Sequence, residues 1–147
     1  MGTLYTIGFT GKGAERFFTL LRQAGIRRVV DVRLHNTSQL AGFSKRDDLA
    51  FFTRELLGAE YVHEPRLAPD EDLFRFIKKD GGGWPEYERR FLELLAERRV
   101  ESVIDPSPLL DGPAALLCTE PTAARCHRRL VAEYLASHWG GLTVEHL

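Results

Sequence analysis

Cysteine is scarce in this chain of 147 residues, which contains only Cys118 and Cys126. Two cysteines are too few for a disulfide scaffold, which excludes a small secreted domain held together by crosslinks. No apolar run approaches the ~18–20 residues that a membrane-spanning helix needs. The first residues, Met1 to Tyr5, also lack the basic and apolar regions of a signal peptide. We therefore expect a cytoplasmic protein with reduced thiols and no membrane partner.

A large net charge is also missing, because the formal charge at pH 7 is −1. The charge is nevertheless uneven: residues 1–54 contain nine Lys and Arg against four Asp and Glu, and residues 55–147 contain eleven against seventeen. A basic first third is compatible with an anionic ligand. It also allows a nucleic-acid-associated module, which the balanced total charge disfavours. The basic residues that such a module would use are Lys12, Arg16, Arg27, Arg28, Lys45, Arg46 and Arg54.

The length and composition fit one globular domain over residues 1–147, with 44% hydrophobic and 28% charged residues. Short apolar runs alternate with amphipathic stretches, which predicts βα units around a mainly parallel sheet. We expect a three-layer α/β domain in which helices flank a sheet of about five strands. The predicted strands are residues 4–7, 29–32, 60–63, 114–118 and 142–146.

Helices are expected where apolar residues recur with helical spacing. The spacing predicts helices from Ala14 to about Gly25, from Asp47 to Gly58, over 70–79, from Pro85 to about Arg99, and from Ala123 to Gly140. Prolines and glycines over 106–113 predict a loop. A homodimer is the expected assembly, because dimers are common among small proteins.

The segment from Leu117 to Arg129 carries the most chemistry. It passes from the end of the most apolar strand, at Cys118, into the start of a helix. Open α/β sheets bind ligands at this edge, and a thiol near a helix N-terminus ionises more easily. Cys118 is therefore a candidate nucleophile or ligand-contacting group, although a small apolar residue packed in the core fits the same position. We expect Cys126 to be a core residue, because it shares a helical face with Leu130.

Three known chemistries can be compared with this spacing. A phosphatase loop has five residues between its Cys and Arg, whereas six separate Cys118 from Arg125. A zinc site is disfavoured because adjacent helical residues point about 100° apart, although Glu120 and His63 could complete an unusual one. A Cys–His pair requires contact within about 3 Å, and the first helical turns could bring Cys118 and His127 together. We expect no metal, and the sequence identifies no cofactor.

A second polar segment closes the second predicted strand. Asp31 lies within an apolar run, where a carboxylate must be paired or hydrogen-bonded. Arg33 points to the same side of the strand and is the natural partner. The two residues form either a structural ion pair or an anion site in which Asp31 orients Arg33. The loop over 35–39, which includes Ser38, is rich in hydrogen-bonding side chains and suits either ligand binding or a polar turn.

These segments resemble the domain of unknown function 488 family over nearly the whole chain. The resembling residues are Tyr5-Thr6-Ile7-Gly8, Val30-Asp31-Val32-Arg33, Ser38, Phe43, Tyr61-Val62-His63 and the run Leu117-Cys118-x-Glu120-Pro121 through Cys126-His127-Arg128. The loop Asn36-Thr37-Ser38-Gln39-Leu40-Ala41-Gly42-Phe43 and the following Leu67-Ala68-Pro69 are similar to one branch of the family. The resemblance implies an α/β fold with a shared pocket, and it supplies no function.

The leading hypothesis is a small enzyme or ligand-binding domain for an anionic, nucleotide-like compound at the carboxyl edge of the sheet. Cys118 would be the nucleophile or ligand, and Glu120 and His127 would act as acid, base or orienting groups. Ligand-binding roles are expected for Asp31, Arg33, Ser38 and Arg128. A third hypothesis, rhodanese-like sulfur transfer, has less support because no Cys-x4-Arg follows Cys118.

Overall fold

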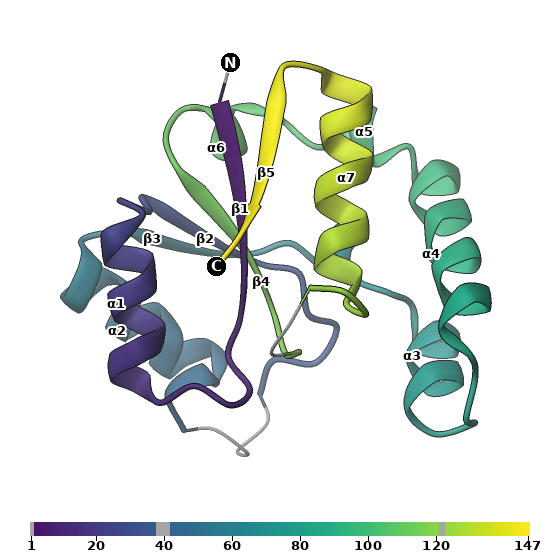
Figure 1. Cartoon of the computed structure of the whole chain (residues 1–147), viewed down its shortest axis with the longest axis horizontal. Helices are drawn as coiled ribbons and strands as arrows, with labels where there is room; N and C mark the ends of the chain where they lie inside the picture. Colours follow the sequence, from purple (N-terminus) through teal and green to yellow (C-terminus); the bar gives the residue numbers. More distant parts are fainter. Residues whose placement is uncertain (1, 38–41, 121–122) are drawn as a thin grey trace.

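The central sheet has five strands that are all parallel, in the order β3-β2-β4-β1-β5. The computed structural model describes residues 2–37, 42–120 and 123–147. The strands are β1 (Gly2–Gly8), β2 (Arg28–Asp31), β3 (Glu60–His63), β4 (Ala114–Cys118) and β5 (Leu142–His146). Every residue of β4 is buried, as a central parallel strand covered on both faces requires. The predicted α/β fold with a parallel sheet is thus confirmed (Figure 1).

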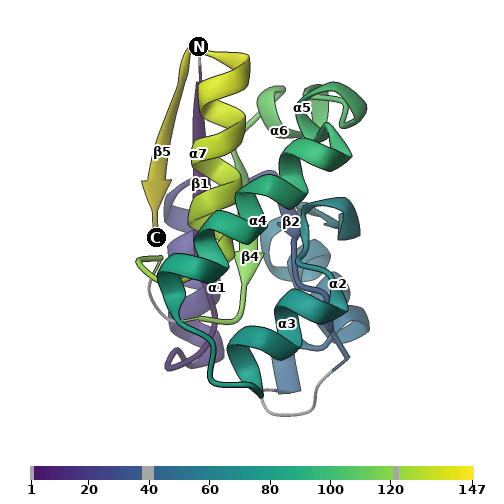
Figure 2. The ribbon, with the colours of Figure 1, turned by 90° about the vertical axis from the view of Figure 1, so that its right-hand side faces the viewer.

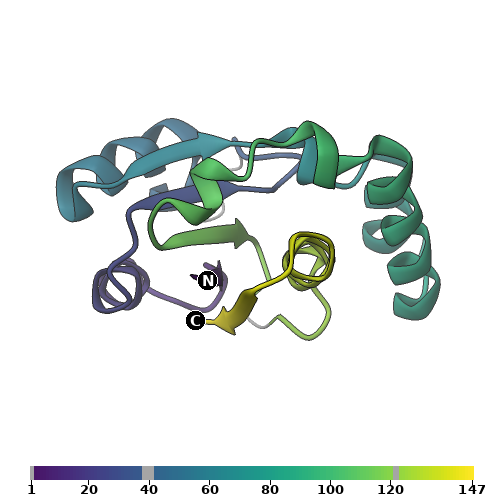
Figure 3. The same cartoon turned by 90° about the horizontal axis from the view of Figure 1, so that it is seen from above.

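Helices cover both faces of the sheet, which gives three layers (Figure 3). On one face, α1 (Ala14–Gln23) and α2 (Arg46–Leu57) pack with Ile7, Val29 and Leu117. On the other face, α3 (Glu71–Lys78), α4 (Trp84–Arg98) and α7 (His127–Trp139) belong to a second core that includes Leu116 and Cys118. The alternation of side chains along each strand therefore divides the apolar residues between two cores.

Two predictions about helices need correction. The last helix begins at His127, because Cys126 is its N-cap with extended backbone angles (φ −135°, ψ 140°). The apolar spacing of Ala123 and Cys126 is thus not helical. The proline-containing stretch over 106–113, expected as a loop, includes the short helix α6 (Ser107–Leu110), preceded by α5 (Val100–Val103). Pro108 fits there because an early helix position needs no backbone N–H donor.

Short 3-10 turns complete the described chain at Gly42–Ser44 and Pro65–Leu67. None of the helices over 2–37, 42–120 and 123–147 combines the length and apolar character needed to cross a bilayer.

The connections around β4 place a crevice at its carboxyl end. The chain after β1 and β2 enters α1 and α2 on one face, whereas the chain after β4 enters α7 on the other. Where the helices that follow two neighbouring strands lie on opposite faces of the sheet, the two connections diverge and leave a crevice at the carboxyl ends of the strands. Open α/β sheets bind ligands in such a crevice. Cys118, the last residue of β4, lies at this point, and residues of α3 and α4 lie around the same crevice. The helices α3 and α4 pack against each other (Figure 2).

Candidate functional site

A cleft opens at the carboxyl end of β4 and is walled by α3 and α4. Its cavity volume is about 70 Å³, which is enough for a few water molecules or part of a small ligand. Cys118, Cys126 and His127 all line it. Further lining comes from Arg33 and His35 after β2, from Phe74 and Lys78 of α3, from Trp84 and Tyr87 of α4, and from Glu120 and Arg125.

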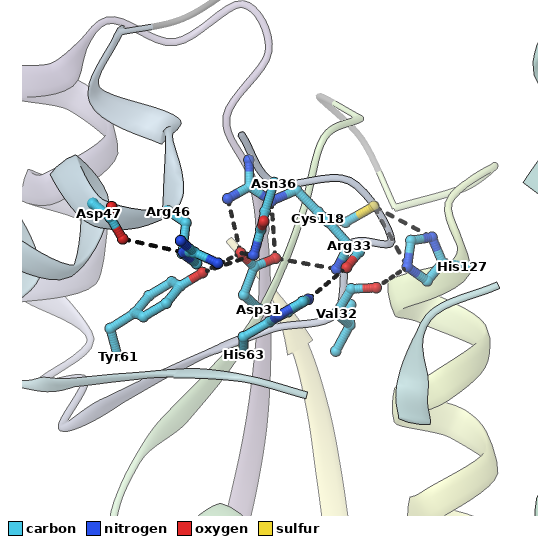
Figure 4. A network of polar contacts seen from close by, with 10 residues as sticks. All are labelled: Asp31, Val32, Arg33, Asn36, Arg46, Asp47, Tyr61, His63, Cys118 and His127. Atoms are coloured by element: carbon cyan, nitrogen blue, oxygen red, sulfur yellow. Dashed lines mark hydrogen bonds and ion pairs between the residues drawn. The ribbon is translucent and has the colours of Figure 1, made fainter. Parts of the chain in front are cut away.

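Cys118 and His127 form a hydrogen-bonded pair in this cleft (Figure 4). The distance from Cys118 Sγ to His127 Nδ1 is 3.4 Å, and both side chains are buried. His127 Nε2 lies 2.7 Å from the carbonyl oxygen of Val32. Because a carbonyl only accepts, Nε2 carries the proton and Nδ1 of the neutral ring presents a lone pair to the thiol. The sequence left open whether Cys118 and His127 meet, and the structure shows that they do. The carbonyl oxygen of Val32 orients the imidazole ring.

The surroundings of Cys118 favour its thiolate. Burial by itself raises the pKa of this thiol. Hydrogen bonds from the Cys126 thiol and from the backbone N–H groups of Thr119 and Glu120, together with the positive charge of Arg128, outweigh burial and lower the pKa. Because the thiolate is the nucleophile, a cysteine with a lowered pKa is more reactive at neutral pH.

Cys126 has a different environment although it is close to Cys118. It is buried in the hydrophobic core, as expected, and burial raises the pKa of its thiol, with the neighbouring Cys118 adding to the rise. The donor atoms of Cys118, Cys126 and His127 all lie within 4.8 Å of one another. The argument that Cys126 and His127 would diverge along a helix fails, because Cys126 precedes the helix. His63 and Glu120 are not in this cluster.

Arg33 and Asp31 form a buried ion pair at the edge of the cleft. Nε and Nη2 of Arg33 both donate to the Asp31 carboxylate at 2.8 Å, and the backbone N–H of Arg33 donates at 3.1 Å. Asp31 is fully buried and Arg33 is 3% exposed. Asn36 and the Tyr61 hydroxyl also donate to the carboxylate. Asp31 therefore orients Arg33 toward the cleft and does not itself line it.

Arg128 lies behind the cleft and is not among its lining residues. It is fully buried, with Nε donating to Thr6 Oγ1 at 3.1 Å and Nη1 to the Glu120 carbonyl oxygen at 2.6 Å. Nη2 has no hydrogen-bond partner among the described residues. A buried guanidinium without a carboxylate is costly, and a thiolate at Cys118 would offset part of that cost.

Comparison with known proteins yields one match. A family model described as a domain of unknown function, DUF488, matches residues 13–135. The chain belongs to the DUF488 family. No curated protein and no solved structure matches it. The matched stretch contains Arg33, Cys118, Cys126 and His127, so the residues of the cleft belong to the DUF488 domain.

Glu120 and Ser38 were also predicted as site residues of this DUF488 chain. Glu120 lines the cleft, and its carboxylate accepts a hydrogen bond from Lys78 Nζ at 2.6 Å. It therefore links the segment after β4 to α3 across the cleft, and among the described residues its carboxylate makes no hydrogen bond with His127 or Cys118. Ser38 lies outside the described residues, so its predicted ligand-binding role stays a prediction.

Sequence reasoning missed the aromatic wall of the DUF488 cleft. Trp84 and Tyr87 stack with ring centroids 5.2 Å apart, and Phe74 meets His35 edge to face at 4.8 Å. The signal was present as closely spaced aromatic residues over 74–91. Helical spacing placed only Tyr87 and Phe91 on an apolar face, and both a core and a cleft satisfy that condition.

The basic residues that would serve a nucleic-acid module are partly neutralised. Arg28, Arg46 and Arg54 form ion pairs with Glu60, Asp47 and Glu55 respectively. Each pair lowers the positive charge available to a phosphate backbone. This alternative stays a prediction, and the cleft offers the more developed site.

Gly8 is required by the close approach of the β4–α7 connection. A Cβ at this position would overlap the Glu120 carbonyl oxygen and lie 2.6 Å from Arg128 Nη1. We expect Gly8→Ala to lower the unfolding free energy by about 1–3 kcal/mol, because well-packed backbone has no room for the methyl group. Urea denaturation measures this change. Gly13→Ala is the matched control, since a Cβ there meets nothing within 4 Å, and a loss as large as that of Gly8→Ala would contradict the argument.

Proposed function

We propose that this DUF488 chain is a small thiol-dependent enzyme that acts on an anionic, ring-bearing compound at the carboxyl edge of the sheet. The observation that carries the proposal is the 3.4 Å contact between Cys118 Sγ and His127 Nδ1 in a cleft. A nucleophile, a base and a third group that orients the base are the components of covalent catalysis by cysteine. A reducing compartment such as the cytoplasm would keep Cys118 active.

The walls of the cleft support an anionic and aromatic substrate class. Trp84 is partly exposed and offers a ring on which a planar group can stack, and the buried Tyr87 stacks against it and holds it in place. Arg125 lines the cleft and has no ion-pair partner among the residues the structure describes. A guanidinium without a partner can bind a phosphate or carboxylate through two parallel hydrogen bonds. A nucleotide-like monophosphate has both the ring and the charge.

The chemical step begins with the thiol proton. Cys118 transfers it to His127 Nδ1, and the thiolate attacks an electrophilic carbon of the substrate to form a C–S bond. The bond to the leaving group breaks with its electron pair, and the leaving group takes the proton from Nδ1. A water molecule then gives its proton to Nδ1 and attacks the same carbon. The C–S bond breaks, and the proton returns from Nδ1 to the Cys118 sulfur.

Ligand protection of the thiol tests this proposal. We expect adenosine monophosphate to slow the alkylation of Cys118 by iodoacetamide, and adenosine to slow it far less, because only the former carries the anion. Arg125→Gln should raise the concentration needed for half protection roughly 10-fold, as loss of a charge-assisted hydrogen bond predicts. Mass spectrometry of the labelled thiol provides the readout.

Arg89→Gln is the matched control, because Arg89 lies outside the cleft lining and pairs with Glu86 and Glu93 on the surface of α4. Its half-protection concentration should equal that of the unaltered protein. Equal protection by adenosine and adenosine monophosphate would remove the anionic substrate class. Slow alkylation of Cys118 without any ligand would remove the thiol mechanism itself.

A further inference from the structure

Three buried soft donors meet at one point of the cleft. The Sγ atoms of Cys118 and Cys126 and a ring nitrogen of His127 lie within 4.8 Å of one another. All three side chains line the cleft. Two thiolates and one imidazole form a ligand set that selects zinc among the common divalent ions. We propose that Cys118, Cys126 and His127 bind one zinc ion, with the fourth coordination position open to the cleft.

The spacing of the donors fits a tetrahedral ion. With Zn–S near 2.3 Å and Zn–N near 2.0–2.1 Å, the sulfur–nitrogen edge of a tetrahedron is about 3.6 Å. The distance from Cys118 Sγ to His127 Nδ1 is 3.4 Å. This edge therefore needs little change, whereas the other donor separations, which are within 4.8 Å, would adjust to about 3.6–3.8 Å. Because the three side chains are already gathered, little of the binding free energy is lost in ordering them.

The outer contacts of the cluster also fit a metal site. A zinc-bound histidine usually donates its second ring N–H to a carbonyl or carboxylate. His127 Nε2 makes this contact with the Val32 carbonyl oxygen at 2.7 Å, which leaves Nδ1 as the ligand atom. Cys118 accepts from the backbone N–H groups of Thr119 and Glu120. These two N–H groups stabilise the Cys118 thiolate both when it is free and when it is bound to a metal.

Charge is compatible with zinc despite the basic neighbours Arg33 and Arg128. Two thiolates neutralise the ion, and the neutral imidazole adds no charge. The positive charge that remains beside the cluster favours an anionic fourth ligand, which is the class of compound proposed for the cleft. The inference therefore rests on the proposed function of the cleft and adds a zinc ion bound by three of the residues that line it.

Zinc and nucleophilic attack compete for the same sulfur. A zinc-bound Cys118 cannot supply its lone pair to a substrate carbon, so metal occupancy would switch off the thiol chemistry. Cys126 separates the two roles. The metal requires its thiolate, whereas the covalent mechanism uses Cys126 only as a thiol that donates a hydrogen bond to Cys118.

Metal titration of the full chain tests the site. Protein reduced and freed of metal by a chelator is titrated with Co²⁺, followed by visible absorption, and with Zn²⁺ in competition with a chromophoric chelator. We expect one ion per chain and thiolate-to-cobalt charge-transfer absorption. Cys126→Ser and Cys126→Ala should each weaken Zn²⁺ binding more than 100-fold, beyond the ~10–100-fold that loss of an outer contact costs. His138→Ala, on the exposed end of α7, should leave binding unchanged.

Thiol labelling of the same samples separates this inference from the proposed function. Zn²⁺ should protect Cys118 from iodoacetamide in the unaltered protein and fail to protect it in Cys126→Ala. Rapid labelling of Cys118 without Zn²⁺ binding would overturn the metal site and leave the thiol mechanism standing. Tight Zn²⁺ binding with slow labelling of the metal-free protein would keep the metal site and overturn the thiol mechanism. Equal Zn²⁺ affinity in Cys126→Ala would place the metal elsewhere and overturn the inference.

Discussion

An Asp31→Asn variant is expected to lose about 3–5 kcal/mol of unfolding free energy, the cost of leaving one partner of a buried ion pair without the other. Asp31 is fully buried and accepts three hydrogen bonds from Arg33 alone. Asparagine keeps the shape but removes the charge, so the buried Arg33 loses the carboxylate with which it is paired. The side-chain NH2 group of asparagine would also face groups that themselves donate hydrogen bonds, including the Tyr61 hydroxyl, so those donors would lose their acceptor. The loss follows from both effects, and urea denaturation at neutral pH measures it.

An exposed pair provides the matched control for this substitution. Asp47 contacts Arg46 at 3.1 Å, with side chains that are 87% and 49% exposed. Asp47→Asn should change stability by no more than about 1 kcal/mol, because solvent screens such pairs. If Asp31→Asn cost no more than Asp47→Asn, Asp31 would not be the counter-ion that holds Arg33 at the cleft.

A His127→Gln variant is expected to slow the alkylation of Cys118 at neutral pH by roughly 100-fold or more, within the range of a positioned proton acceptor. The Gln amide can still donate to the Val32 carbonyl oxygen, but it offers no basic nitrogen to the thiol. The reaction of metal-free protein with iodoacetamide measures the rate, and circular dichroism confirms that the fold is retained.

His138→Gln on the exposed part of α7 is the control for this comparison. His138 Nδ1 interacts with the Tyr134 carbonyl oxygen and lies away from the cleft, so its substitution should leave the rate of Cys118 unchanged. An unchanged rate in His127→Gln would show that His127 does not accept the thiol proton of Cys118.

Most of the fold could be predicted from the sequence because its signals are local. The apolar run Ala114–Cys118 and the β-branched residues of β2 mark buried strands, and Gly58 ends α2 in the left-handed conformation that glycine favours (φ 62°). The start of α7 was missed because Ala123 and Cys126 fall by spacing on the helical face. The extended backbone of Cys126 (φ −135°, ψ 140°) ends that pattern, and apolar spacing carries no information about it.

The site could be predicted only in part, because local signals in the sequence do not show which distant residues come together. Asp31 and Arg33 are two residues apart, so their pairing follows from strand geometry. Whether Arg128 reaches the ligand depends on the space beside β1, where Thr6 and the Glu120 carbonyl oxygen hold it behind the cleft. Likewise, the sequence predicts a helix from Pro85 onward but does not reveal that Trp84, at the start of α4, lines a cleft.

The pH dependence of Cys118 alkylation tests the central claim most directly. The surroundings of Cys118 lower its pKa, so thiolate accumulates at lower pH than in a free cysteine. In chelator-treated protein the rate should rise with pH through an inflection well below the ~8.5 of an unperturbed thiol and then level off. Cys118→Ser should abolish this phase, and Cys126 should react slowly throughout. An inflection at or above the free-thiol value, or equal labelling of both cysteines, would contradict the account of Cys118 as a poised nucleophile.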